Sequence, residues 1–205
     1  MKLYYSPGAC SLTAHIALKE SGLAFEAVTA STKTHKLADG TDYYSINPLG
    51  YVPLLELDDG TRLTEVSAIV QYIADQAPAK NLAPANGSLP RYQLQSWLNF
   101  IGTELHAKFG LLFNPATPQE VKNGIRERMA SRLQWVEGEL AGKSYLMGET
   151  FSVADAYLFT VSNWARLVAL DIAPYANLAA LRARVGARLA VLAAMTDEGL
   201  IKATT

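Results

Sequence analysis

The chain has 205 residues, half of them hydrophobic, and a formal net charge of −1. This length allows one large or two small domains with a substantial core, and the scattered charges indicate neither nucleic acid nor an anionic membrane as a partner. The only cysteine, Cys10, excludes an internal disulfide and a cysteine-rich zinc cluster, which fits a reducing compartment. Because no signal-peptide pattern follows Met1 and no apolar run is long enough to span a bilayer, we expect a cytoplasmic protein.

The amino-terminal residues predict a strand, a helix and a second strand. A short β-prone run at 2–5 is followed by a helical pattern from Cys10 to Gly22, and residues 24–28 return as a strand. The crossover in such a β-α-β unit makes its two strands parallel.

Cys10 and Ser11 lie at the predicted start of this helix. The partial positive charge of a helix start favours a thiolate, and the lowered pKa is what a nucleophilic cysteine requires. The alternative is a small buried cysteine that fills a gap in the core. Ser11 is a candidate donor to a thiolate, but a serine at this position is also an ordinary N-cap.

Two polar segments predict connections between elements. Residues 31–44 are weakly periodic and carry His35 and Lys36, which are either solvated or able to hold a substrate carboxylate. Residues 79–89 are rich in proline, asparagine and glycine, which is typical of a linker.

Residues 47–69 predict a turn, a hairpin and a helix start. Pro53 heads an apolar strand, where a missing backbone donor is tolerated, and Asp58-Asp59-Gly60 reverses the chain into a partner strand at 62–64. The next helix begins after Glu65. Together with the first two strands, this order predicts an α/β domain over residues 1–78, a thioredoxin-like fold with a four-stranded mixed sheet.

The same stretch suggests a peptide-binding edge. If the Val52-Pro53 bond is cis, the Val52 backbone turns outward and can pair with a short extended peptide. Glu65 would then take an α-amino group, and the amides of Val66 and Ser67 at the helix start would take a carboxylate. A trans proline in an ordinary hairpin is the alternative.

Residues 90–205 predict an all-α domain. A long amphipathic pattern runs to Phe113, and Thr117-Pro118-Gln119-Glu120 has the form of a capping box that starts another helix. A second capping box, Ser152 to Asp155, starts a helix so apolar that we expect it at the centre of a bundle. Two shorter helices follow, near 178–188 and 190–195.

The long helix carries one candidate polar face. Asn99, Thr103 and His106 are spaced i, i+4 and i+7, which would align an amide, a hydroxyl and an imidazole. This face is either a solvated stripe or, if it meets Cys10, a source of an acid, a base or an orienting donor. The three histidines show no metal-ligand spacing, and the chain has no glycine-rich phosphate loop.

Four segments together resemble a known family: Met1-Lys-Leu-Tyr-Tyr-Ser-Pro-Gly-Ala-Cys10-Ser, Asn47-Pro-Leu-Gly-Tyr-Val-Pro53, Thr64-Glu65 and Phe151-Ser-Val-Ala-Asp155-Ala. They look like a cytosolic glutathione transferase, and the cysteine and His106 point to the bacterial beta class. The resemblance spans nearly the whole chain. It implies a thioredoxin-like glutathione domain joined to an all-helical domain, a homodimer, glutathione held between the domains, and a cis bond before Pro53.

The resemblance also implies roles for individual residues. The Tyr51-Val52-Pro53 segment would pair with the cysteinyl part of glutathione, and Glu65 with the amides of Val66 and Ser67 would hold the γ-glutamyl end. Cys10 would lie beside the sulfur. His35 stands where the family has a lysine that contacts the glycyl carboxylate, so that contact falls to His35 or to Lys36.

Further roles concern the helical domain and the strand before Cys10. His106 would approach the sulfur, and Asn99 and Thr103 look like contacts at the domain or dimer interface. Tyr5 resembles the catalytic tyrosine of other classes, although it is not generally essential in the beta class. We expect an apolar cavity for the second substrate at Phe109, Phe113 and Trp164, with at least one of them taken up by core packing.

These observations predict an enzyme that conjugates the glutathione thiolate to hydrophobic electrophiles, with no other cofactor. Donors from Cys10, Ser11, His106 and the helix start would stabilise the thiolate. Reduction of disulfides or peroxides through a mixed disulfide at Cys10 is a second activity that could coexist. The alternative is a non-catalytic protein that binds glutathione or hydrophobic ligands on the same scaffold.

Overall fold

The computed structural model describes residues 1–202, and the chain forms two compact units. The first unit contains Met1–Ala83 together with the chain from Ala187 onward, and the second contains Pro84–Gly186. Within the described residues, none of the helices combines the length and the apolar character needed to cross a membrane.

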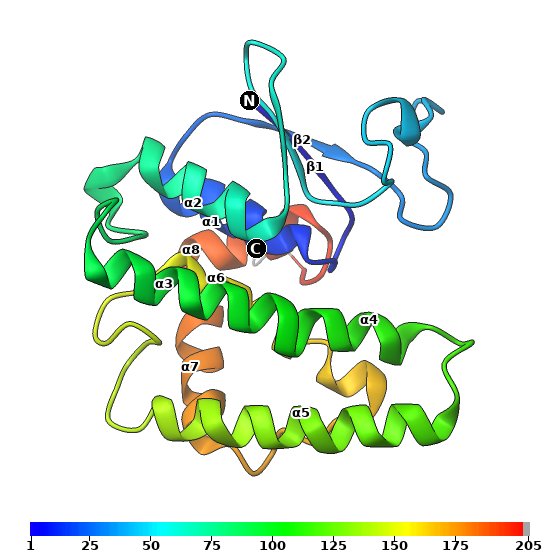
Figure 1. Ribbon diagram of the computed structural model, residues 1–205. Helices are drawn as coiled ribbons and strands as arrows, with labels where there is room; N and C mark the ends of the chain where they lie inside the picture. Colours follow the sequence, from blue (N-terminus) through cyan, green and yellow to red (C-terminus); the bar gives the residue numbers. More distant parts are fainter. Residues whose placement is uncertain (203–205) are drawn as a thin grey trace. The chain divides into compact units, whose positions relative to one another are not determined.

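The first unit is built on a four-stranded mixed sheet (Figure 1). Strands β1 (Lys2–Tyr5) and β2 (Glu26–Thr29) are parallel, whereas β3 (Leu54–Glu56) pairs antiparallel with both β1 and β4 (Arg62–Thr64). The spatial order β2-β1-β3-β4 follows from the β-α-β unit and the hairpin that the sequence predicted. The predicted thioredoxin-like α/β domain is therefore confirmed.

Helices cover this sheet. Helix α1 (Ser11–Ser21) ends at Gly22, which adopts the left-handed conformation expected of a glycine C-cap, and it packs against α2 (Val66–Gln76). Leu3 pairs with Leu55 across β1 and β3, and both side chains are fully buried. Two short 3-10 helices, Tyr43–Ser45 and Pro78–Lys80, complete the segment before the linker.

The carboxyl-terminal helix differs from the expected division into 1–78 and 90–205. Helix α8 (Leu189–Asp197) packs against α1 and belongs to the first unit. Arg188 forms a bidentate ion pair with Glu20 of α1, with Nε–Oε1 and Nη2–Oε2 distances of 2.5 and 2.9 Å. Such long-range pairing carries no periodic signal, so the sequence assigned this helix to the domain that precedes it.

The second unit is all-helical, as predicted. Its elements are α3 (Leu89–Phe100), a π-helix η3 (Ile101–His106), α4 (Ala107–Phe113), α5 (Gln119–Glu139), α6 (Val153–Ser162), a 3-10 helix η4 (Ala165–Val168) and α7 (Ala176–Gly186). Every residue of α6 is buried, which confirms its predicted central place. The capping box predicted at Thr117 is wrong: Pro118 is the N-cap of α5, and no side chain caps the helix.

Candidate functional site

Cys10 lies at the amino-terminal end of α1, as the sequence predicted. It is the N-cap residue of that helix and remains partly accessible to solvent. Its thiol donates a hydrogen bond of 3.1 Å to the carbonyl oxygen of Val52, the residue before the cis Val52-Pro53 bond. The cis bond that the resemblance implied is thus confirmed, and Cys10 and Val52 are direct neighbours.

The sequence left two alternatives for Cys10: a thiolate with a lowered pKa, or a small buried cysteine. The structure favours the second. Burial of the sulfur raises the pKa of the Cys10 thiol to about 12. The backbone amides of Cys10 and Ser11 act in the opposite direction, and the negative charge of Glu65 raises the pKa further. The helix start is therefore outweighed, and at neutral pH Cys10 is a neutral thiol that donates a hydrogen bond.

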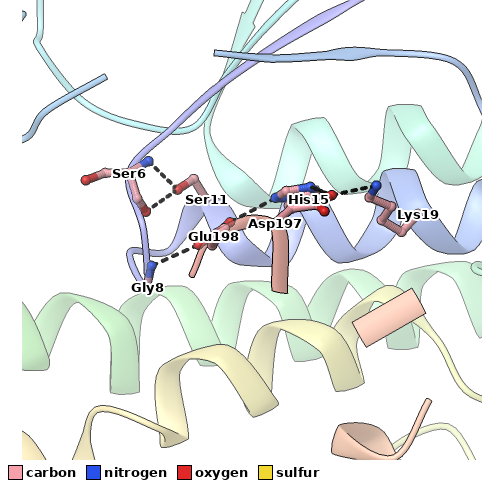
Figure 2. A network of polar contacts seen from close by, with 7 residues as sticks. All are labelled: Ser6, Gly8, Ser11, His15, Lys19, Asp197 and Glu198. Atoms are coloured by element: carbon pink, nitrogen blue, oxygen red, sulfur yellow. Dashed lines mark hydrogen bonds and ion pairs between the residues drawn. The ribbon is translucent and has the colours of Figure 1, made fainter. Parts of the chain in front are cut away.

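Ser11 connects the helix to the preceding loop. Its side chain is fully buried, accepts a hydrogen bond from the amide of Ser6 at 3.1 Å and donates to the carbonyl of Ser6 at 3.2 Å (Figure 2). The hydroxyl proton is thus committed to the backbone. The candidate donor at Ser11 is therefore its backbone amide, which forms a hydrogen bond with the sulfur of Cys10, rather than its hydroxyl.

A buried polar network lies on the other side of this loop, and sequence reasoning missed it. The Glu198 carboxylate accepts a hydrogen bond of 2.8 Å from the amide of Gly8 and lies 3.0 Å from His15 Nδ1 (Figure 2). His15 is fully buried, and its Nε2 lies 3.6 Å from Asp197, which pairs with Lys19 at 2.6 Å. A histidine within a helical apolar pattern was the available signal, but its partners are more than 180 residues away in the chain.

The carbonyl of Tyr51 is also held in place. It accepts hydrogen bonds from the Tyr43 hydroxyl at 2.9 Å and from the Asn47 side-chain amide at 2.7 Å. The Tyr51 side chain itself is exposed, whereas Val52 is buried in a small cluster with Tyr43 and Leu54. These contacts fix the backbone on either side of Val52.

Glu65 starts helix α2 with an unusual backbone. Its φ of 69° and ψ of 122° lie in a region that a non-glycine residue rarely adopts, and such residues concentrate at binding sites. The Glu65 side chain is exposed and caps no helix amide. Val66 and Ser67 supply the first amides of the helix, where an anion can bind. The negative charge of Glu65 raises the pKa of the Cys10 thiol, so the two side chains interact electrostatically.

His35 packs beside the turn that leads to Val52. Its ring stacks on Tyr44 with a centroid distance of 4.5 Å. A Cβ atom added to Gly50 would lie 2.7 Å from the Tyr44 ring and 2.8 Å from His35 Nδ1, and Gly50 has φ of +68°, so only glycine fits there. Lys36 is exposed. The structure thus brings His35, rather than Lys36, against the turn that contains Tyr51.

In the second unit, His106 belongs to an aromatic cluster. His106 Nδ1 lies 2.6 Å from the Tyr157 hydroxyl, and its ring lies 5.3 Å from that of Trp164. Phe109 and Phe113 contact Trp164 at centroid distances of 5.5 and 5.8 Å. Burial lowers the pKa of His106. Phe109 is fully packed in the core, whereas Phe113 is about half exposed, as expected for a cluster that is part core and part surface.

Three further residues lie apart from these clusters. The face predicted for Asn99, Thr103 and His106 runs through a π-helix at residues 101–106, whose i→i+5 turns do not keep the 3.6-residue period on which the prediction was based. Asn99 and Thr103 are exposed, and the Thr103 hydroxyl donates to the Asn99 carbonyl at 3.0 Å. Tyr5 is buried on β1, with its ring 5.5 Å from that of His15.

Comparison with known proteins agrees with this geometry. Residues 8–76 match the model of the glutathione S-transferase N-terminal domain, and residues 100–188 match that of the C-terminal domain. The chain is 46% identical over 200 residues to glutathione S-transferase GstA of Escherichia coli O157:H7, covering 98% of this chain and 100% of that protein.

Solved structures show the same similarity. A sphingomonad glutathione S-transferase complexed with glutathione has a TM-score of 0.93 and 48% identity, covering 98% of this chain and 100% of the other. The bacterial beta-class enzyme of Sphingomonas chungbukensis has a TM-score of 0.94 and 46% identity, with the same coverage. The chain therefore belongs to the glutathione S-transferase family, and it resembles the bacterial beta class throughout its length.

Proposed function

We propose that this protein is a glutathione transferase that joins the thiolate of glutathione to hydrophobic electrophiles. The observation that carries the proposal is the arrangement in the first unit. The Cys10 thiol donates to the Val52 carbonyl beside a cis proline that precedes β3, and Glu65, with its strained backbone, joins β4, the strand paired with β3, to α2. A thiol, an extended backbone and an isolated carboxylate are complementary to the sulfur, the peptide group and the α-amino group of glutathione.

Each group has a role in this proposal. The Val52 backbone pairs with the cysteinyl residue of glutathione, Glu65 binds its ammonium group, and the Val66 and Ser67 amides bind the γ-glutamyl carboxylate. His35 contacts the glycyl carboxylate, which its position beside Gly50 supports. Lys36 is the second candidate for that contact.

The chemistry requires an anionic sulfur. A free thiol with a pKa of about 8.5 is only a few per cent ionised at neutral pH. Lowering this pKa by one unit requires about 1.4 kcal/mol of preferential interaction with the thiolate. The Cys10 thiol and the Ser11 amide are the proposed hydrogen-bond donors to the thiolate in the first unit, and His106 is the candidate donor in the second. The thiolate then attacks an electrophilic carbon, a carbon–sulfur bond forms, and the leaving group departs with its electron pair.

The second substrate is proposed to contact the aromatic cluster of the helical unit. Phe113 is the exposed member, and Trp164 and His106 lie behind it. Apolar, aromatic surface of this kind suits a hydrophobic electrophile. Asn99 and Thr103 are exposed and are proposed as contacts with glutathione or with a second subunit.

Titration with reduced glutathione tests the binding step. We expect saturable heat in calorimetry and a rise in melting temperature, because a ligand that binds only the folded state stabilises it. Glu65→Gln should weaken both effects, whereas Glu26→Gln, on the exposed edge strand β2, should leave them unchanged. No response at millimolar glutathione would remove the proposed function.

A Cys10→Ala variant separates the two glutathione chemistries. A neutral Cys10 thiol that only donates a hydrogen bond can be replaced with partial loss of conjugation, whereas disulfide reduction through a mixed disulfide at Cys10 would disappear. The raised pKa of Cys10 favours the donor role. A non-catalytic binding protein would respond to glutathione but show no conjugation with any electrophile.

We further propose that the protein acts as a homodimer in the cytoplasm. A surface pocket of about 370 Å³ lies on the helical unit, lined by aromatic side chains of α3 and α5: Trp97, Phe100 and Trp135. Trp135 is nearly half exposed, and such an aromatic patch suits a protein interface. Light scattering of the purified protein gives the oligomeric state, and a monomer at micromolar concentration would contradict this part of the proposal.

A further inference from the structure

Tyr157 contacts His106 in a way that the sequence did not reveal. The Tyr157 side chain is buried on the apolar helix α6, and its hydroxyl lies 2.6 Å from His106 Nδ1. The two rings meet edge to face with a centroid distance of 5.7 Å. A polar hydroxyl at the centre of an apolar bundle is costly unless it is hydrogen-bonded. The contact is therefore a specific one.

The backbone around His106 supports the same contact. The π-helix Ile101–His106 interrupts the otherwise α-helical segment 89–113, and single π turns of this kind occur frequently at functional sites. Gly102, inside this segment, has no side chain, and a Cβ atom placed there would lie 3.6 Å from the Tyr157 hydroxyl. The hydroxyl thus lies against both the backbone of the π-helix and its last side chain.

The direction of this hydrogen bond follows from acidity. A buried imidazole whose positive charge is poorly solvated is neutral, so one ring nitrogen carries a proton and the other accepts one. A phenol is a stronger acid than a neutral imidazole N–H, so the hydroxyl is the donor in the more stable arrangement. Nδ1 accepts this proton, and the imidazole hydrogen is then on Nε2.

We propose that Tyr157 is a positioning residue that fixes His106 in the Nε2–H tautomer, so that His106 presents a hydrogen-bond donor, rather than an acceptor, to an anionic group of the substrate. The inference rests on the proposed function only for the last step, in which the anionic group forms during conjugation. The opposite tautomer would direct a lone pair at that group and repel it. Tyr157 therefore decides whether His106 favours the anion or opposes it.

Nitrogen-15 NMR of the imidazole side chains tests the tautomer directly. The chain has three histidines, and a His106→Asn variant assigns the signals of His106. In the wild-type protein we expect an unprotonated Nδ1 and a protonated Nε2. In Tyr157→Phe, which keeps the ring, the Nδ1 resonance should lose the shift that a donated hydrogen bond causes. A proton on Nδ1 in the wild type would overturn the proposal, whatever the spectrum of Tyr157→Phe.

Conjugation kinetics test the consequence. Loss of one net hydrogen bond predicts that Tyr157→Phe lowers kcat/KM by about twofold to tenfold. Tyr175→Phe is the matched control, because it removes another phenol hydroxyl of the same unit, which donates to the Ala130 carbonyl at 3.0 Å. That control should keep the wild-type rate, and Tyr157→Phe should have no further effect in a His106→Asn background.

The two arms separate the inference from the proposed function. If the wild-type protein does not conjugate glutathione, the proposed function fails, while the NMR spectrum still decides the tautomer. If the wild type is active and Tyr157→Phe keeps its full rate, or loses as much activity in the absence of the His106 imidazole, Tyr157 does not act through His106 and the inference is overturned.

Discussion

The sulfur of Cys10 is surrounded by groups with opposite effects on its charge. The amides of Cys10 and Ser11 stabilise the thiolate, whereas burial and the negative charge of Glu65 oppose it, and burial is the largest of these influences. The thiol consequently keeps its proton and donates it to the Val52 carbonyl. If this single proton turns from the Val52 carbonyl to the sulfur of a bound thiolate, the neutral thiol can stabilise that anion, because it adds no negative charge beside it.

Removal of the Glu65 charge should make Cys10 more acidic. In Glu65→Gln the repulsion between the carboxylate and the thiolate is lost, so the pKa of Cys10 should fall, while burial still keeps it above its ordinary value. The pH dependence of alkylation by iodoacetamide, or of thiolate absorbance, measures this pKa. Glu56→Gln, whose carboxylate pairs with Arg62 at 2.9 Å, serves as a control. An unchanged or higher pKa in Glu65→Gln would contradict the assignment of Glu65 to this site.

At the scale of the elements, the cap of helix α6 is built on Asp155. Its carboxylate accepts hydrogen bonds of 2.8 Å from the amides of Leu146 and Ser152 and from the Ser152 hydroxyl. Burial nevertheless raises the pKa of Asp155 to about 6, since the three donors only partly replace water. The capping box predicted at Ser152 is confirmed. Its Asp155 carboxyl group is buried and titrates above its ordinary pKa.

This pKa predicts how stability depends on pH. An unfolded aspartic acid titrates near about 4, so between pH 4 and 6 the folded chain binds more protons than the unfolded one. The free energy of unfolding should therefore fall as pH rises through this window, by up to about 3 kcal/mol from Asp155. Denaturant unfolding of the wild type and Asp155→Asn at several pH values measures the difference between their slopes. Asp171→Asn, at an exposed position, should keep the wild-type slope of the free energy of unfolding against pH. If Asp155→Asn kept that slope too, Asp155 would not be the group responsible for it.

The elements show how far sequence periodicity reaches. Alternation and the turn at Asp58-Asp59-Gly60 predicted β3 and β4, and the apolar circumference of α6 predicted its buried place. The same reasoning could not reveal the π-helix, because nothing in a 3.6-residue pattern marks an i→i+5 turn. It also left the charge state of Cys10 open, since that state depends on burial by residues distant in sequence.

At the scale of the whole molecule, the last helix of the described residues packs against the first helix. Helix α8 and the residue that follows it, Glu198, pack on α1, more than 180 residues earlier in the sequence. Neither hydrophobic pattern nor capping signals encode such a return, which explains why the helix was assigned to the second domain. Helix α8 therefore completes the first unit. The loop that leads to Cys10 is held by the hydrogen bond from the Gly8 amide to Glu198.

Replacing Glu198 with alanine tests this closure. The substitution removes the carboxylate that binds the Gly8 amide and Nδ1 of buried His15, so we expect a loss of about 1–3 kcal/mol in the free energy of unfolding. Because Gly8 lies two residues before Cys10, glutathione conjugation should fall even below the melting temperature. Denaturant unfolding and initial rates at the same temperature measure both effects.

A matched acidic site separates this effect from a general loss of charge. Glu139→Ala removes an exposed carboxylate whose pair with Lys143, at 3.6 Å, spans one turn of helix, and such surface pairs contribute little to stability. We expect the free energy of unfolding of this variant to lie within about 0.5 kcal/mol of the wild-type value. If Glu198→Ala changed the free energy of unfolding as little as Glu139→Ala, the carboxyl-terminal segment would not stabilise the first unit. The position of Cys10 would then depend on α1 and the Val52 turn alone. If Glu198→Ala destabilises the fold as expected, the segment that contains Glu198 is an integral part of the first unit.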